Sequence, residues 1–300
     1  MTRPLSPEEM YPAGHRSIAT RMLSLRSGLR VRVLESGPAD GPTVLLLHGW
    51  GACSYSFRHA LELLPNHGIR TIAVDLRGFG LSDKPTRRGV YTLDAYVADL
   101  EQVVDAIGVS RPTLIGHSMG GGIALHYALH RPERVGRIAL INPVGLVPLR
   151  LIGLARLSPR SLFRLLDGRL TPRLLIRFIL RRIAYGQPSL VSDRVIDEYW
   201  APTQLTGFGY AARATVGEFQ WAPVGRTAAA SLAVPCVVIL GDSDRLVRDA
   251  RSRARQLAGA AVHELSGGHC VHEEDPSRVY AIIESFVTNS PSIKSHNDLN

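Results

Sequence analysis

The residues with the clearest chemical potential form the segment Gly116-His117-Ser118-Met119-Gly120, a G-x-S-x-G pattern. It stands between a run of residues typical of a strand and a run typical of a helix. A serine at the apex of a sharp strand-to-helix turn presents its hydroxyl outward, and flanking glycines leave room for the strained backbone. A chance match in a chain with 28 glycines is the alternative, which this placement disfavours. The pattern therefore predicts that Ser118 is a nucleophile.

A second glycine-containing segment, residues 48–51 (HGWG), follows a short apolar run at 43–47. A loop at the end of a central strand can turn a backbone N–H toward the serine, and the helix N-terminus after Ser118 offers another donor. We therefore expect the backbone N–H groups of Trp50 and Met119 to form an oxyanion hole. A simple tight turn is the alternative for this loop.

A serine nucleophile needs a general base, for which eleven histidines compete. His269 follows the last predicted strand, at the sheet edge where α/β proteins bind ligands, and is preferred over His263 and His272. An acid that orients the imidazole is expected between the serine and the histidine in the chain. Asp244 follows the preceding predicted strand at the better offset, and Asp242 is the alternative.

Four further residues are candidates for contacting a substrate. His48, Gly49 and His117 adjoin the two glycine-containing segments, and Phe178 is one of many apolar residues between the two halves of the α/β pattern. The alternative for Phe178 is packing between that stretch and the rest of the protein. The ring of His117 is expected to point away from the serine beside it.

The elements that must position these residues follow an alternating pattern of short strand-like runs and longer helical runs, typical of βαβ units and a mainly parallel sheet. The expected strands are 17–25, 29–35, 43–47, 70–75, 112–116, 135–141, 234–240 and 261–265. The expected helices are 55–64, 92–107 with Thr92 as cap and Gly108 as end, 119–129, 247–258 and one starting at Pro276.

The pattern breaks between residues 145 and 231, where no buried strand is predicted. Residues 149–182 repeat apolar and arginine residues at helical spacing. The sequence therefore predicts an α/β core at 1–144 and 232–300, interrupted by a helical cap insertion at 145–231.

Composition narrows the possible partners. The net charge of +9 comes almost entirely from arginines spread along the chain, without the aromatic interleaving of nucleic-acid readers, so we expect no nucleic-acid partner. The three cysteines lack metal-ligand spacing, and we expect neither metal nor cofactor. Without a signal-like or membrane-spanning run, the sequence is that expected of a cytoplasmic protein, with peripheral membrane contact by the insertion as a less favoured option.

These motifs, in this order, resemble the α/β-hydrolase superfamily, and in particular its small bacterial esterases, lipase-like enzymes and carbon–carbon bond hydrolases. The segments that carry the resemblance are residues 48–51, 75–83 (DLRGFGLSD), 116–121, 241–244 (GDSD) and 267–269 (GGH). The resemblance covers about residues 20–145 and 232–287. It implies a twisted eight-stranded sheet with helices on both faces, and a helical cap where the insertion lies.

The resemblance also implies an activity. It favours a serine esterase acting on a small-molecule ester, with a lactonase, thioesterase or carbon–carbon hydrolase as alternatives and a non-catalytic binding protein as a remote one. It implies a structural role for Asp75 and the loop 77–83. The related haloalkane dehalogenases and epoxide hydrolases carry aspartate where this chain has Ser118, which argues against both of those activities. His117 is similar to esterases and lipases, whereas carbon–carbon hydrolases often have asparagine there.

Overall fold

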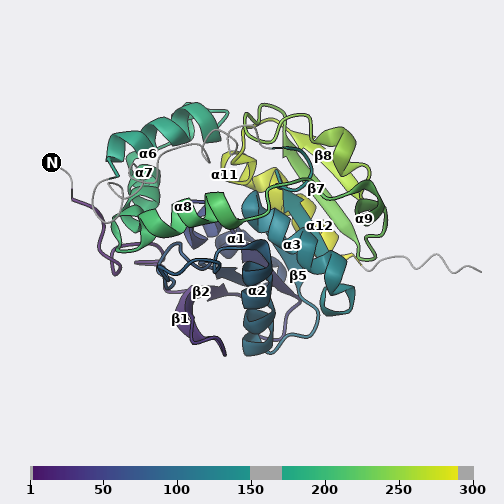
Figure 1. The fold of residues 1–300 in the computed structure, drawn as a ribbon, viewed down its shortest axis with the longest axis horizontal. Coiled ribbons are helices and arrows are strands. Elements are labelled where there is room, and N and C mark those ends of the chain that lie inside the picture. Colours follow the sequence, from purple (N-terminus) through teal and green to yellow (C-terminus); the bar gives the residue numbers. More distant parts are fainter. Residues whose placement is uncertain (1–2, 149–170, 290–300) are drawn as a thin grey trace, which may run out of the picture.

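The computed structural model describes residues 3–148 and 171–289 of the chain, whose strands form one eight-stranded sheet (Figure 1). The strands are β1 (Ala19–Ser24), β2 (Arg30–Ser36), β3 (Thr43–Leu47), β4 (Arg70–Val74), β5 (Thr113–His117), β6 (Arg137–Ile141), β7 (Cys236–Gly241) and β8 (Ala261–Leu265). Their order in the sheet is β1-β2-β4-β3-β5-β6-β7-β8. Strand β2 pairs antiparallel with β1 and β4, and the other neighbours are parallel. The sheet is therefore mainly parallel, as the sequence predicts.

Helices cover both faces of the sheet, so the inner strands are buried on both sides. They are α1 (Arg58–Leu63), α2 (Leu93–Ile107), α3 (Met119–His130), α10 (Arg251–Ala254), α11 (Val271–Glu274) and α12 (Pro276–Thr288) in the core, with short 3₁₀ segments η1 (Ser54–Phe57), η2 (Leu64–His67) and η3 (Pro132–Arg134). Alternate residues of β3 show the two layers: Leu45 and Leu47 pack with α2 and α3, and Val44 and Leu46 pack with α1 and α12.

The predicted boundaries hold where local signals are strong. Strands β3 and β8 match their predicted ranges. Helix α2 begins where the Thr92 hydroxyl accepts a hydrogen bond from the Ala95 N–H at 3.2 Å, and ends at Gly108 with φ of 72°. The helix predicted at 247–258 is wrong in extent: α10 covers only Arg251–Ala254, and it starts after Asp249 because an α-helix cannot continue through the φ of 59° at that residue.

Between β6 and β7, the described residues 171–231 contain helices and no strand. These are α6 (Arg173–Ile179), the π-helical segment η4 (Leu180–Ala184), η5 (Pro188–Leu190), α7 (Asp193–Trp200), η6 (Ala201–Gln204), α8 (Phe208–Glu218) and α9 (Arg226–Ala230). Residues 149–170 of the predicted helical stretch lie outside the described residues. The division into core and cap at residues 145 and 231 remains a prediction.

The described part of the insertion lies against loops that follow the carboxyl ends of several strands. The Trp50 Nε1–H, after β3, donates to the Ala212 carbonyl of α8 at 3.0 Å. A Cβ on Gly186 would lie 2.7 Å from the backbone nitrogen of Gly268, after β8. The insertion therefore contacts the sheet edge where the predicted functional residues lie.

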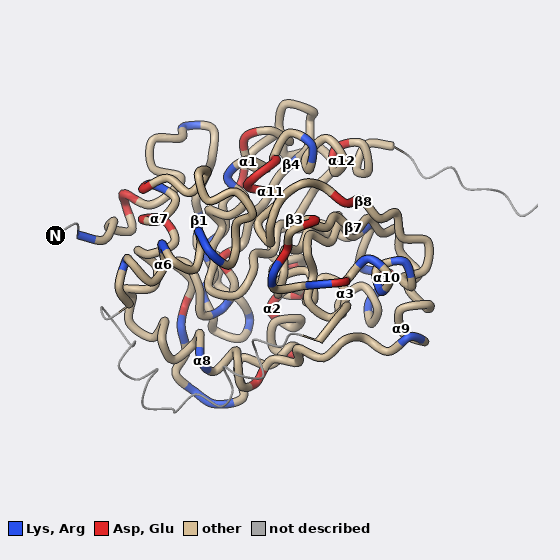
Figure 2. The backbone as a smooth tube through the Cα atoms, turned by 90° about the horizontal axis from the view of Figure 1, so that it is seen from above, with Lys and Arg blue, Asp and Glu red and all other residues tan. Residues whose placement is uncertain are grey.

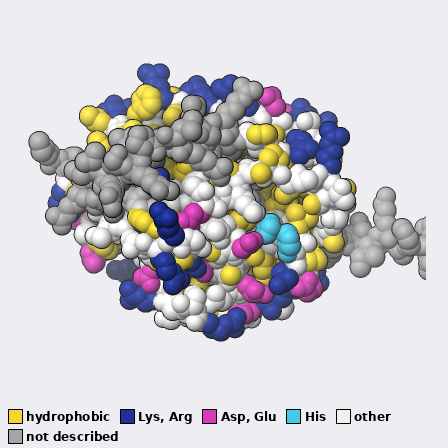
Figure 3. All heavy atoms as spheres, viewed as in Figure 1, with side chains coloured by type: hydrophobic (Ala, Val, Ile, Leu, Met, Phe, Trp, Pro, Cys, Tyr) yellow, Lys and Arg dark blue, Asp and Glu magenta, His cyan; other side chains and the backbone are white. Residues whose placement is uncertain are grey.

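Lys and Arg lie on helices in several parts of the molecule (Figure 2). On the face shown in Figure 3 they lie along the upper, right and lower edges, and Asp and Glu are found mainly in the lower half. Cys53, Cys236 and Cys270 are free and buried. Among the described residues, no helix has the length and apolar character needed to cross a bilayer.

Candidate active site

Ser118 occupies a sharp turn between β5 and α3. Its backbone has φ of 51° and ψ of −114°, a conformation rare for a residue with a side chain. A Cβ on Gly116 would lie 2.4 Å from the Gly120 carbonyl oxygen, and one on Gly120 would lie 2.0 Å from the Leu47 carbonyl oxygen. Both contacts are too close for any larger residue, so the two flanking glycines are required for this turn, as argued from the sequence.

His269 and Asp244 are brought together from the loops that follow β8 and β7. The His269 Nδ1 lies 2.8 Å from the Asp244 Oδ2, and the other oxygen of Asp244 accepts from the N–H groups of Leu246 and Val247 at 2.7 and 3.1 Å. Burial alone raises the pKa of Asp244, but His269 and the two backbone donors outweigh it, so the pKa lies below its usual value. The carboxylate thus stays ionised and holds the Nδ1–H tautomer, which leaves Nε2 as the basic nitrogen.

The turn at Ser118 and the loop of His269 meet through His117. The His117 ring centroid lies 4.8 Å from that of His269, and its Nε2 lies 2.9 Å from the His269 carbonyl oxygen. Its ring also lies 4.4 Å from the ring of His272. Burial lowers the pKa of His117 to about 3, so its imidazole is neutral at pH 7. The structure places His117 inside the protein, 4% exposed, as a packing contact between the two loops.

The backbone N–H groups of Trp50 and Met119 are the predicted oxyanion donors. In residues 3–148 and 171–289, neither group makes a hydrogen bond. Met119 is the first residue of α3, where the helix leaves its N–H groups unpaired. A Cβ on Gly49, which precedes Trp50, would lie 3.2 Å from the Ser118 Cβ. The loop after β3 therefore lies directly beside the serine.

Asn142 is a positioning residue that the sequence analysis missed. It directly follows β6 and has a φ of 40°. Its Nδ2 donates to the carbonyl oxygens of Gly268 and His269 at 3.1 and 2.9 Å, and its Oδ1 accepts from the Gly241 N–H at 2.9 Å. One side chain thus joins the ends of β6 and β7 to the loop that carries His269. An asparagine immediately after a central strand was the available signal.

His48, Gly49 and Phe178, three of the candidates for contacting a substrate, lie in different environments. His48 is fully buried, and its Nε2 accepts from the Leu76 N–H at 2.9 Å while its Nδ1 lies 2.8 Å from the Gly49 carbonyl oxygen. No ring nitrogen of His48 is left for a substrate. Gly49 lies beside Ser118. Phe178 is on α6 with 56% of its surface exposed.

The alternative acid, Asp242, accepts a hydrogen bond from the Gly267 N–H at 3.1 Å and so holds the loop that follows β8.

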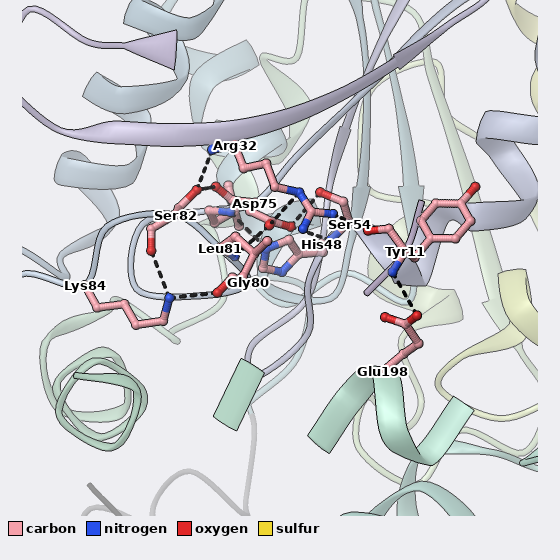
Figure 4. Close-up of polar contacts among 11 residues, drawn as sticks. Tyr11, Arg32, His48, Ser54, Asp75, Gly80, Leu81, Ser82, Lys84 and Glu198 are labelled. Carbon is pink, nitrogen blue, oxygen red and sulfur yellow. Dashed lines mark hydrogen bonds and ion pairs between the residues drawn. The ribbon is translucent and has the colours of Figure 1, made fainter. Parts of the chain in front are cut away.

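A second polar cluster is centred on Asp75, the buried residue that directly follows β4 (Figure 4). Its Oδ1 accepts from the N–H and hydroxyl of Ser54 at 2.7 and 2.6 Å, and its Oδ2 accepts from the Leu81 N–H at 2.8 Å and lies 3.5 Å from the Arg32 Nε. Burial alone raises the pKa of Asp75, but Arg32 and these hydrogen bonds keep it below its usual value. Burial lowers the pKa of Lys84, at the cluster's edge, to about 8.

Comparison with known proteins identifies the family of the chain. The chain belongs to the α/β-hydrolase fold family, whose model matches residues 42–276. It is 40% identical over 116 residues to epoxide hydrolase 4 of Mus musculus, a match that covers 39% of this chain but only 32% of that protein. The chain is therefore a member of a hydrolase superfamily, and its own substrate is a separate question.

Two solved structures show the same fold. An epoxide hydrolase, CorEH, superposes with a TM-score of 0.79 at 23% identity, covering 90% of this chain and 98% of that one. The enol-lactonase of Burkholderia xenovorans LB400 superposes with a TM-score of 0.73 at 20% identity, covering 89% and 99%. Within the described residues, His, Cys, Asp and Glu side chains form no group of three that could hold a metal ion.

Proposed function

We propose that this protein is a serine hydrolase that cleaves carboxylic esters through an acyl-enzyme on Ser118. The observation that carries the proposal is the 2.8 Å contact between His269 Nδ1 and the buried Asp244, together with a serine held at φ of 51° in the turn that His117 joins to the loop of His269. A strained serine at a helix N-terminus, an oriented imidazole and two unpaired backbone donors are the parts that acyl transfer requires.

In the proposed reaction, the Ser118 oxygen attacks the ester carbonyl while the His269 Nε2 takes the hydroxyl proton. The N–H groups of Trp50 and Met119 stabilise the oxyanion of the tetrahedral intermediate. His269 returns its proton to the departing alcohol, which leaves an ester between Ser118 and the acyl group. Water then gives a proton to His269 and attacks this ester, which releases the acid and restores the serine. Asp244 stabilises the imidazolium at both stages.

The epoxide-hydrolase relative raises a second candidate, which the chemistry of Ser118 disfavours. A carboxylate that opens an epoxide forms an ester, which water can hydrolyse. A serine that opens an epoxide would form an ether, which has no carbonyl carbon for water to attack. The serine would therefore be consumed after one turnover. We expect epoxides to be poor substrates of this protein.

Lactones, thioesters and activated carbon–carbon bonds remain alternatives to simple esters, since each presents a carbonyl to the same nucleophile. A lactone is an internal ester, and the enol-lactonase structure shares this fold. A binding protein without catalysis is the remaining alternative, in which Ser118 would be unreactive.

A hydrolysis panel tests the proposal. It should contain p-nitrophenyl esters from acetate to long acyl chains, together with lactones, thioesters and an epoxide. We expect the parent to turn over esters and Ser118→Ala to lose on the order of 10⁴-fold or more of that rate while remaining folded. Ester hydrolysis at the parent's rate by the Ala variant would show that Ser118 is not the nucleophile. Preference for another class of carbonyl compound would reassign the substrate but keep the triad.

A further inference from the structure

Two adjacent acids, Glu273 and Glu274, end the short helix α11 shortly after His269. Their exposed fractions are 5% and 9%, and the proposed reaction uses neither of them. A buried carboxylate is stable only when its oxygens are bonded. The partners of the two side chains therefore show what each one holds in place.

Glu274 joins two segments that are far apart in the sequence. Its Oε1 accepts a hydrogen bond from the Gly268 N–H at 2.7 Å, and its Oε2 accepts one from the Gln187 N–H, also at 2.7 Å. Gly268 precedes His269, and Gln187 belongs to the helical insertion. The Glu274 carboxylate is therefore shared between the loop of His269 and the insertion, because each of its oxygens accepts one backbone hydrogen bond.

The same two segments are also in direct backbone contact. The Cys270 N–H donates to the Ala184 carbonyl oxygen at 3.1 Å. A Cβ on Gly268 would lie 2.3 Å from the backbone nitrogen of Gly186, and the reciprocal distance for Gly186 is 2.7 Å. Neither position can carry a larger side chain unless the segments move apart. Residues 184–187 and 267–270 therefore form one packed unit.

Glu273 anchors the insertion without bonding to residues 267–269. Its carboxylate accepts hydrogen bonds from the hydroxyls of Tyr185 and Tyr199 at 2.8 and 2.5 Å and forms an ion pair with Arg58. Among the described residues, none of its side-chain hydrogen bonds or ion pairs reaches residues 267–269. Glu273 and Glu274 thus lie on the same helix and are both buried, but of the two side chains it is Glu274 that bonds to the backbone of Gly268, directly before His269.

We propose that Glu274 is a positioning residue that sets the orientation of His269 and couples it to the insertion through residues 184–187. Asn142 holds the carbonyl oxygens of Gly268 and His269 from the β6 side, and Glu274 holds the Gly268 N–H from the other side. A displacement of residues 184–187 therefore reaches the loop of His269 through this carboxylate as well as through the backbone contact between Ala184 and Cys270. This inference rests on the proposed function, because it assigns Glu274 a part in that same site.

The test compares Glu274→Gln with Glu273→Gln as its matched control. A glutamine at 274 has one acceptor oxygen and one amide group, so it can accept from only one of the two backbone donors and presents N–H to the other. Glu273→Gln makes the same chemical change in the same helix, but it weakens the contacts to Tyr185, Tyr199 and Arg58 and leaves the hydrogen bond from the Gly268 N–H to Glu274 in place. The midpoint of thermal unfolding is measured for both variants, so that loss of stability is separated from loss of positioning.

The first readout is the rate at which a fluorophosphonate probe modifies Ser118. We expect this rate to fall at least tenfold in Glu274→Gln and to stay within twofold of the parent in Glu273→Gln. The second readout is deuterium uptake by residues 184–187 and 267–270, which does not depend on catalysis. We expect both segments to exchange faster in Glu274→Gln, whereas in Glu273→Gln residues 267–269 keep the exchange of the parent.

The outcomes separate this inference from the proposed function. A parent protein that the probe does not modify would refute the proposed function, while unchanged exchange of both segments in Glu274→Gln would refute the coupling. Labelling of Glu274→Gln at the parent's rate, or an equal loss in Glu273→Gln, would also overturn the positioning role. If Glu274→Gln does not fold, Gly186→Ala pushes the segments apart from the insertion side. It should slow labelling at least fivefold, and labelling at the parent's rate would contradict the inference.

Discussion

Asp75 and Asp244 each follow a central parallel strand, β4 and β7, and both are shielded from water. Asp75 accepts hydrogen bonds from Ser54 on one oxygen and from the Leu81 N–H on the other, which also forms an ion pair with Arg32. Asp244 gives one oxygen to backbone N–H groups and leaves the other to His269. A carboxylate saturated by fixed donors holds a loop in place, whereas a carboxylate with one oxygen on an imidazole can stabilise a transient charge.

Of the two aspartates, Asp244 is expected to have the larger effect on activity, and Asp244→Asn tests it. The amide keeps the size of the side chain but removes the charge that stabilises the His269 imidazolium, and it permits the wrong tautomer. We expect kcat to fall by about 10⁴-fold with little change in the free energy of unfolding. Steady-state kinetics on the best ester of the panel, with urea unfolding as control, measures both. Activity within tenfold of the parent would transfer the role to another acid, Asp242 first.

Asp75→Asn should produce the opposite pattern, a loss of stability. It leaves the Arg32 guanidinium, 3% exposed, without its buried partner, which costs about 3–5 kcal/mol of unfolding free energy. The matched control is Asp83→Asn, since Asp83 pairs with the exposed Arg30 and that pair contributes below about 1 kcal/mol. Urea unfolding gives the difference. Equal stability of the two variants would show that the Asp75 cluster does not hold the loop.

The sequence predicted those elements and site residues whose signals lie in neighbouring residues of the chain. The apolar run of β3, the capped helix α2 and the glycines around Ser118 carry their signals in neighbouring residues. Asn142, Glu273 and Glu274 were missed, because their roles depend on which loops meet in space. His48 was a candidate for a substrate contact because it adjoins a motif, yet both of its ring nitrogens are bonded to backbone. Adjacency in sequence does not show which way a side chain faces.

Buried histidines also differ in their partners. Unlike His269, three of them form no hydrogen bond or ion pair with a carboxylate of the described residues. Burial lowers the pKa of His48 and His272 and brings that of His117 to about 3, whereas an unfolded histidine titrates near 6.5. The unfolded state therefore binds more protons below pH 6.5, so stability is full above that pH and falls as the pH decreases. Each such histidine contributes a slope of up to about 1.4 kcal/mol per pH unit.

Urea unfolding between pH 7.5 and 5 measures this dependence. His272→Phe is the sharpest variant, because the ring lies in an aromatic and imidazole environment next to Phe57 and His117. Below pH 6.5 the unfolding free energy of this variant should depend on pH less steeply than that of the parent, by up to about 1.4 kcal/mol per pH unit. Identical slopes in the two proteins would mean that His272 already binds a proton in the folded state.

The smallest effect is expected from Trp50→Phe. This change removes the hydrogen bond from Nε1 to the Ala212 carbonyl oxygen but keeps the backbone N–H proposed for the oxyanion hole. We expect kcat within about twofold of the parent and a loss of about 0.5–1.5 kcal/mol in stability. A fall in kcat of a hundredfold would show that the indole, through its contact with the insertion, is needed for the chemistry.

The central claim is that Ser118 is an activated nucleophile, and covalent modification tests it most directly. Incubation with a fluorophosphonate, followed by mass spectrometry of the intact protein and its peptides, locates any adduct. The account predicts one phosphonyl group per chain on Ser118 in the parent, far slower labelling in Asp244→Asn and none in Ser118→Ala. An unmodified parent, or an adduct on another residue, would contradict it.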